Sequence, residues 1–193
     1  AASLPLFVAD AGDHAALRRL CAQARVVVST VGPYALHGEP LVAACAATGT
    51  DYADLTGEVQ WIRRMIERHA GAARASGARL VHACGFDSIP SDLGVLFLQR
   101  RARERLGEPC ARVSMRVRTL RGGVSGGTVA SLLNVVREAA ADPALRRILV
   151  DPYALCPPES PEVAAARPRQ PRTRGARLDA EWGSWVAPFV MSA

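Results

Sequence analysis

Short apolar runs alternate with longer segments of helical periodicity over the first hundred residues. The apolar runs predict strands at residues 6–9, 25–30, 50–55 and 79–83. Residues 25–30 contain three consecutive valines and show no alternation of apolar and polar positions. We therefore expect this second strand to be buried on both faces, as in a parallel sheet that helices cover on each side.

The segments between these runs place apolar residues at helical spacing and carry signals for helix ends. Asp13 is a candidate N-cap, and Gly49 and Gly77 suit the left-handed position that follows a helix. The predicted helices cover residues 13–21, 38–48, 56–76 and 88–106. Strand and helix thus alternate about every 25–30 residues with short connections, which predicts an α/β fold with a doubly wound parallel sheet.

The pattern changes after residue 107. Residues 111–118 alternate apolar and polar side chains with period two, which is typical of an antiparallel strand with one exposed face. A glycine-rich loop then precedes a helix at about 129–140 and a short helix that ends near 149. We therefore expect a second, α+β domain over 108–193.

Two further segments complete this second region. Residues 157–181 are rich in proline and arginine, and we predict a solvated or mobile loop there. Residues 182–190 become apolar again and predict a strand.

The composition excludes several classes of protein. The chain has 193 residues, a formal charge of +6 and 24 basic residues, all of them arginine and spread along the sequence. Because aromatic residues are few and the cations are not clustered, we expect no nucleic-acid partner. No run is long enough to span a bilayer, and no secretory signal is visible. The first residue is Ala1 rather than methionine, so we expect a fragment of a longer protein.

Cysteine and histidine spacing argues against a metal site and against a disulfide framework. The five cysteines include no C-x-x-C pair, and no H-x-x-x-H pair occurs. A reducing cytoplasm is therefore the expected location.

Polar and small residues follow each predicted strand, at the sheet edge where doubly wound proteins bind ligands. These segments are Asp10, residues 29–34, residues 54–58 and residues 84–88. Each also has a simpler interpretation: Gly32-Pro33 as a plain turn, Asp87-Ser88 as a helix cap, and Glu58 as a partner of a helix dipole. No G-x-G-x-x-G occurs, so the residues alone predict only an α/β domain that binds a small ligand.

Longer strings resemble a known family. The segment S-T-V-G-P-Y-A-L-H-G-E-P-L-V-A-A-C-A-A-T-G-T-D-Y-A-D-L-T-G-E and the later H-A-C-G-F-D-S-I-P-S-D-L-G are similar to the saccharopine dehydrogenase-like oxidoreductases, in particular to their trans-acting enoyl reductase branch. S-G-G-T, D-P-Y-A-L and W-V-A-P-F-V-M farther along the chain resemble the same branch.

The resemblance implies the C-terminal part of a Rossmann NAD(P)-binding domain over residues 1–107. The start of an α+β substrate or dimerisation domain would follow over 108–193. The cofactor would be NADP or NAD. The implied cofactor-binding residues are Asp10 near the adenine, Thr30, Val31, Gly32 and Pro33 near the nicotinamide ribose and pyrophosphate, and Cys84, Gly85 and Phe86 near the nicotinamide.

The implied reaction is hydride transfer to an enoyl double bond of a small-molecule or lipid-type substrate. Tyr34, His82 and Asp87 are candidate proton donors, and nothing in their spacing selects one of them, so the catalytic residue is left open. The alternative is a non-catalytic NAD(P)-binding scaffold or regulatory protein. A homo-oligomer and a peripheral contact with a membrane are both compatible with the sequence.

In this family the glycine fingerprint lies on a first strand, which would precede residue 1. Residues 6–9 would then be the third strand of a 3-2-1-4-5-6 sheet and residues 25–30 the fourth. We therefore expect residues 6–9 to have no neighbouring strand and the fourth strand to have an unpaired edge. We also expect the isolated chain to be poorly soluble and unable to bind NAD(P)H.

Overall fold

The computed structural model describes residues 5–119, 121–123, 125–156, 164–165, 167–168 and 175–187. Its centre is a parallel sheet of β1 (Val26–Ser29), β2 (Asp51–Asp54) and β3 (Leu80–Val81), hydrogen-bonded in the order β1-β2-β3. Val28, Ala53 and Val81 lie in register across the three strands. The predicted α/β class with a parallel, Rossmann-type sheet is confirmed.

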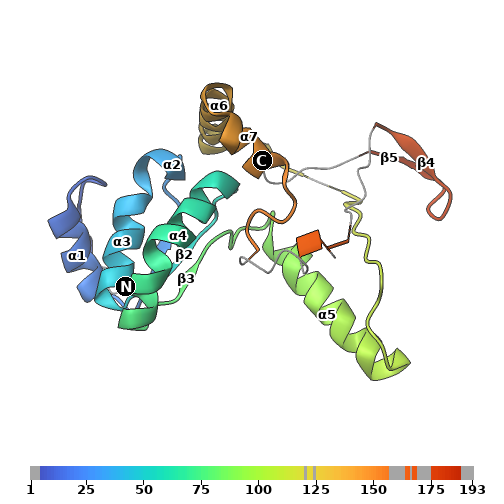
Figure 1. Ribbon diagram of the computed structural model, residues 1–193, viewed down its shortest axis with the longest axis horizontal. Helices are drawn as coiled ribbons and strands as arrows, with labels where there is room; N and C mark the ends of the chain where they lie inside the picture. Colours follow the sequence, from blue (N-terminus) through green and yellow to red (C-terminus); the bar gives the residue numbers. More distant parts are fainter. Residues whose placement is uncertain are drawn as a thin grey trace.

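Three helices lie against one face of this sheet: α1 (His14–Ala22), α3 (Glu39–Thr48) and α4 (Val59–Ser76) (Figure 1). The side chain of Asp13 accepts the N–H of Ala16 at 2.9 Å and so caps α1, as predicted. Gly49 and Gly77 end α3 and α4 with φ of 75° and 83°, which a residue without a Cβ adopts without strain.

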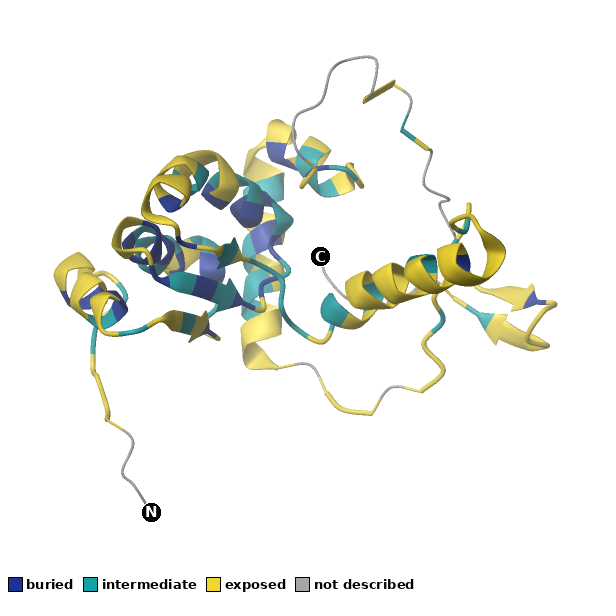
Figure 2. Cartoon of the chain, turned by 90° about the horizontal axis from the view of Figure 1, so that it is seen from below, coloured by how far each residue is buried: buried dark blue, intermediate teal, exposed yellow. Residues whose placement is uncertain are grey.

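The core lies between these helices and the sheet. Figure 2 shows most of the buried residues in this part of the molecule. The largest side chains with almost no exposed surface are Tyr52, Trp61 and Met65, and they pack with Tyr34 and Val42 in one cluster. Burying aromatic and aliphatic side chains of this size is the main driving force for folding this half of the chain.

The opposite face of the sheet is uncovered in the described part of the chain. Val26, Val28 and Val81 are 54%, 69% and 51% exposed, whereas Val27 and Tyr52, which point the other way, contact the core. The expectation that residues 25–30 are buried on both faces is therefore wrong. Successive residues of a strand point to opposite faces, and helices cover only the face to which Val27 and Tyr52 point.

The predicted first strand is also absent. Residues 6–9 form no strand, and Leu6 and Val8 are 89% and 86% exposed. A strand is stable only when a neighbour completes its backbone hydrogen bonds. None of the described strands pairs with residues 6–9, in agreement with the expectation that this run has no neighbouring strand.

Residues 84–88 form the predicted turn, and α5 (Ile89–Leu106) follows it. This helix extends away from the sheet, and only Ala102 is buried along its length (Figures 1 and 2). Within the described residues, no helix combines the length and the apolar composition that crossing a membrane requires.

The second region begins with an extended segment and continues as two helices. The strand predicted at residues 111–118 is not formed, because its backbone pairs with none of the described strands; only the side chain of Arg116 pairs with Asp179, across 2.7 Å. The two predicted helices are present as α6 (Gly126–Ala141) and α7 (Pro143–Val150), which pack together near the N-terminus of α4 (Figure 1).

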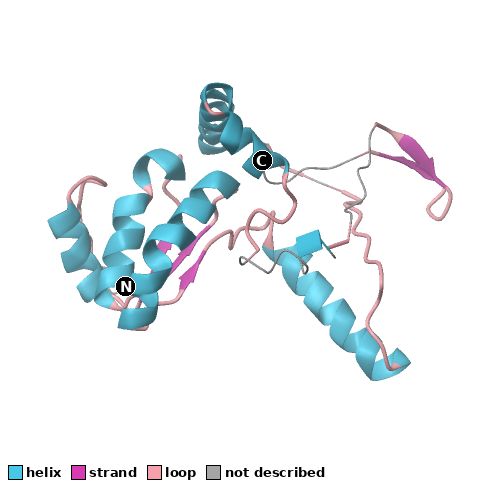
Figure 3. Cartoon of the chain, viewed as in Figure 1, coloured by secondary structure: helices cyan, strands magenta, loops and turns pink. Residues whose placement is uncertain are grey.

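A two-stranded antiparallel sheet of β4 (Arg177–Asp179) and β5 (Ser184–Val186) follows (Figure 3). β5 lies inside the strand predicted at 182–190, of which residues 188–190 are outside the described residues. β4 falls in the segment predicted as a loop, so that prediction is wrong at residues 177–179 because these residues pair with β5. Most of residues 157–174 also lie outside the described residues.

Candidate functional site

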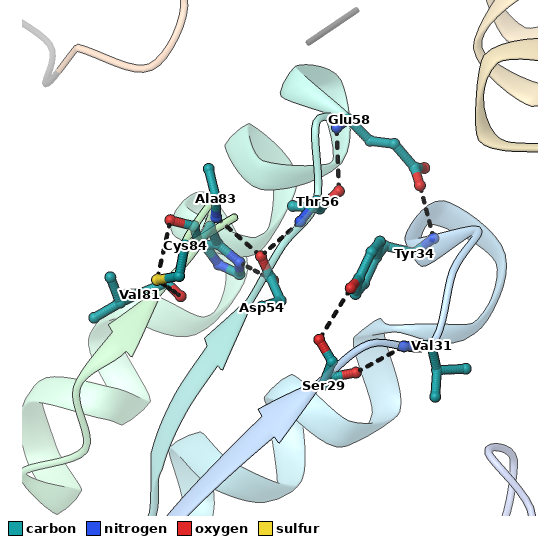
Figure 4. Close-up of polar contacts among 10 residues, drawn as sticks. Ser29, Val31, Tyr34, Asp54, Thr56, Glu58, Val81, Ala83 and Cys84 are labelled. Atoms are coloured by element: carbon teal, nitrogen blue, oxygen red, sulfur yellow. Dashed lines mark hydrogen bonds and ion pairs between the residues drawn. The ribbon is translucent and has the colours of Figure 1, made fainter. Parts of the chain in front are cut away.

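The loops that follow the three parallel strands meet at one edge of the sheet (Figure 4). Ser29 ends β1, Asp54 ends β2, and His82 comes directly after β3. Parallel strands end at the same side, so the polar residues that follow them in the sequence come together in space. This edge is the candidate functional site.

Asp54 is the centre of the hydrogen-bonding network at this edge. Its side chain has no exposed surface, and its Oδ1 accepts the N–H groups of Thr56 at 3.1 Å and Ala83 at 3.0 Å. Its Oδ2 lies 2.7 Å from Nδ1 of His82. Because a carboxylate only accepts hydrogen bonds, Nδ1 of His82 carries the shared proton. A buried carboxylate needs such donors in place of water.

The loop after β3 is held in an unusual backbone conformation. Ala83 has φ of +57°, and the N–H of Cys84 donates to the carbonyl oxygen of Asp54 at 2.6 Å. A Cβ at Gly85 would lie 2.6 Å from Oδ1 of Asp87, so a side chain there would force a neighbour to move. Phe86 is 74% exposed. The loop therefore presents an aromatic side chain to solvent beside a tightly held backbone.

The loop after β1 is anchored through Tyr34. The N–H of Tyr34 donates to Oε1 of Glu58 at 2.7 Å, and its phenol donates to the carbonyl oxygen of Ser29 at 3.0 Å. Residues 30–33 lie between these two anchors, and Val31 is 57% exposed. Tyr34 also begins α2 (Tyr34–His37), a short helix that the sequence did not predict.

Glu58 has a different role from the one that its position in the sequence suggests. It precedes α4, but its side chain makes no capping hydrogen bond to that helix. Its carboxylate, on a residue 2% exposed, instead accepts the N–H groups of Tyr34 and Ala35 and the hydroxyl of Ser131. No spacing rule connects residues this far apart, so the sequence gives no signal for this contact.

Two of the three candidate proton donors are held by protein contacts. Tyr34 is 4% exposed, and burial raises the pKa of its phenol, with the charges of Asp54 and Glu58 adding to the effect. The His82 side chain is 7% exposed and packs edge-on against Trp61, with ring centroids 5.1 Å apart. Asp87, the third candidate, lies beside Gly85 in the loop after β3.

The structure brings together two of the three groups of predicted cofactor-binding residues. Thr30, Val31, Gly32 and Pro33 follow β1, while Cys84, Gly85 and Phe86 come shortly after β3, at the same sheet edge. Asp10 belongs to neither loop: it lies in the turn before α1, where its Oδ1 accepts the N–H of Gly12 at 2.7 Å.

The glycine-rich loop before α6 has a structural role. The Ser125 side chain accepts the N–H of Thr128 at 3.1 Å and so caps α6. Across the part of the chain that the structure describes, His, Cys, Asp and Glu side chains form no group of three suited to a metal ion.

Comparison with known proteins adds independent information. Residues 6–81 match the family model of the saccharopine dehydrogenase NADP binding domain. A protein of Mycobacterium leprae (strain TN) named trans-acting enoyl reductase is 45% identical over 191 residues, which cover 97% of this chain and 46% of the relative. A protein of the same name from Mycobacterium tuberculosis (strain ATCC 25618 / H37Rv) is 45% identical over 195 residues, or 100% of this chain and 47% of the relative.

A second Mycobacterium tuberculosis protein, which carries the same enzyme name as a provisional assignment, is 49% identical over 190 residues, or 97% of this chain and 45% of the relative. The chain thus spans about half the length of the curated relatives it matches. No solved structure matches it significantly. Residues 6–81 are therefore similar to the saccharopine dehydrogenase NADP binding domain, and over nearly all its length the chain is similar to proteins named trans-acting enoyl reductase.

Proposed function

We propose that the whole protein is an NAD(P)-dependent oxidoreductase and that the loops after β1 and β3 bind its dinucleotide. The observation that carries this proposal is the convergence of these two loops at the carboxyl edge of a parallel sheet, within and directly after the segment that matches an NADP-binding family. Ligands of doubly wound proteins bind at this edge.

The residues of the two loops fit a dinucleotide. Gly32 has no side chain, so a ligand can approach its backbone closely, although a Cβ there would already touch the Tyr34 ring at 3.5 Å and Oγ of Ser131 at 3.6 Å. Val31 and Phe86 offer exposed apolar surface on the two loops, which suits a flat aromatic ring. We assign residues 30–33 to the nicotinamide ribose and pyrophosphate, and residues 84–86 to the nicotinamide. Asp10 is assigned to the adenine on the resemblance alone.

The reduced cofactor would supply the hydride, and the chain would bind and orient it. The names of the relatives support reduction of an enoyl double bond. The substrate is then an α,β-unsaturated acyl compound of lipid metabolism. The phenol of Tyr34 donates to Ser29 and Nδ1 of His82 is held by Asp54, so we favour Nε2 of His82, Asp87 or water as the source of the proton. All five cysteines are free, which fits a cytoplasmic location. A homo-oligomer and a peripheral membrane contact stay predictions.

Titration of the full-length protein with NADPH, followed by cofactor fluorescence, tests the proposal. We expect saturable binding and at least a tenfold loss of affinity in Gly32→Leu, because a leucine would have to displace the Tyr34 ring or Ser131 and so disturb the loop assigned to the cofactor. The matched control is Gly71→Leu in α4, where a Cβ meets no atom within 4 Å; it should bind as the wild type does.

The possible outcomes separate the parts of the proposal. A wild-type protein that binds neither NADPH nor NADH contradicts the function itself. Equal affinity in Gly32→Leu contradicts the assignment of residues 30–33. NADPH binding without oxidation by any α,β-unsaturated acyl substrate would favour the non-catalytic scaffold.

A further inference from the structure

One buried carboxylate joins α6 to the loop that follows β1. Oε1 of Glu58 accepts the N–H of Tyr34 at 2.7 Å and the hydroxyl of Ser131 at 3.0 Å, while its Oε2 accepts the N–H of Ala35 at 2.9 Å. Ser131 belongs to α6 and lies 73 residues from Glu58 in the chain. The contact therefore crosses from the sheet region to the region that follows it.

The same loop is fixed from its other side. The phenol of Tyr34 donates to the carbonyl oxygen of Ser29, where β1 ends. Residues 30–33 thus connect two points that Tyr34 holds, one by its backbone N–H and one by its side chain (Figure 4). The hydroxyl of Ser131 also lies 3.6 Å from the point that a Cβ at Gly32 would occupy, so α6 borders the loop directly.

We propose that Glu58 and Ser131 are positioning residues for the dinucleotide, through which α6 sets the conformation of residues 30–33. This inference rests on the proposed function, because it requires that residues 30–33 bind the cofactor. A loop that is already held in its binding conformation does not have to be ordered when the ligand arrives, so its affinity is higher. Removing the Ser131 hydroxyl should therefore weaken cofactor binding although Ser131 need not contact the cofactor.

The experiment compares two contacts of α6 in the full-length protein, one to Glu58 and one to α4. Ser131→Ala removes the hydrogen bond to Glu58. The control, Glu138→Ala, removes the contacts of α6 to Gln60 at 3.1 Å and Arg64 at 3.6 Å, both on α4 and neither on the loop. We expect NADPH binding about tenfold weaker in Ser131→Ala, which corresponds to about 1.4 kcal/mol, and less than twofold weaker in Glu138→Ala. Ser131→Thr, which keeps a hydroxyl, should restore most of the affinity.

A measurement without cofactor tests how firmly the loop is held. Backbone hydrogen exchange over residues 30–37 should be faster in Ser131→Ala than in Glu138→Ala. Equal exchange in the two variants, or equal NADPH affinity, overturns the positioning role and leaves the proposed function intact. A wild-type protein that binds no dinucleotide overturns the proposed function and this inference with it.

Discussion

Oδ2 of Asp54 lies 2.7 Å from Nδ1 of His82, and this pair fastens the end of β2 to the loop after β3. The other carboxylate oxygen of Asp54 holds the backbone of Thr56 and Ala83. One side chain thus fixes two of the three loops at the candidate site. β3 itself is only two residues long, so these bonds supply much of the attachment that a longer strand would provide.

We expect Asp54→Asn to lower the free energy of unfolding by about 2–3 kcal/mol, because an amide cannot accept all the hydrogen bonds that the buried carboxylate accepts. Urea denaturation followed by circular dichroism measures this change. The control is Asp51→Asn at the other end of β2, whose partner Arg79 has a side chain 81% exposed. Its effect should be clearly smaller, since water screens that pair. Equal losses in the two variants would contradict a special role for Asp54.

Gly38 should tolerate no side chain. A Cβ there would lie 2.7 Å from Cζ2 of Trp61 and 2.9 Å from the carbonyl oxygen of Tyr34. We expect Gly38→Ala to destabilise the protein by about 1–3 kcal/mol, because the core has to shift to make room. Gly71→Ala, in the open middle of α4, should stabilise by about 0.5–1 kcal/mol. Thermal unfolding should show a lower midpoint temperature for Gly38→Ala and a higher one for Gly71→Ala than for the wild type. An unchanged midpoint in Gly38→Ala would argue against this close packing.

The cysteines should differ sharply in reactivity. Cys21 and Cys45 are fully buried with their Sγ atoms 3.5 Å apart, and burial raises the pKa of both thiols. Because the thiolate is the reactive form, neither should be alkylated by iodoacetamide at neutral pH until the chain unfolds. Cys156, which is exposed, should react in the folded protein. Peptide mass spectrometry after timed labelling measures the order in which the cysteines react. Labelling of Cys45 before the chain unfolds would contradict the described packing of α1 against α3.

The contact between Arg116 and β4 should depend on pH. Hydrogen bonds from Arg116 hold the pKa of Asp179 below its usual value. Because the pKa of Asp179 is lower in the folded chain than in the unfolded chain, where it is about 3.9, the pair stabilises the fold at pH values above that. This stabilisation is lost as the pH falls through the lower pKa of the folded chain. Carboxyl NMR titration should give a pKa for Asp179 below its ordinary value in the wild type and a pKa nearer the ordinary value in Arg116→Ala. An unchanged titration would show that the pair does not form in solution.

The predictable parts of the fold are those with local signals. Asp13 caps α1 and Gly49 and Gly77 end α3 and α4 where the sequence places them, because each acts on backbone groups within one turn. The segments at residues 6–9 and 111–118 have the right local pattern but form no strand, since a strand also depends on a neighbour that its own residues do not specify.

The candidate site shows the same division. The sheet edge follows from strand polarity, so the sequence located residues 30–33 and 84–86 together. The contact of Glu58 with Tyr34 and Ser131 depends on how distant segments pack, and no periodicity reveals it. The sequence also placed Tyr34 and His82 among candidate proton donors; in the structure the phenol of Tyr34 donates to Ser29, and Asp54 holds Nδ1 of His82 but not its Nε2.

The bare face of the sheet, where Val26, Val28 and Val81 meet solvent, affects the calorimetry of the chain. Apolar groups that already touch water in the native state add nothing to the heat capacity gained when the chain unfolds. The 193 residues should therefore show a heat-capacity increment below the roughly 12–15 cal/mol/K per residue of ordinary globular proteins, with a correspondingly flatter curve of stability against temperature.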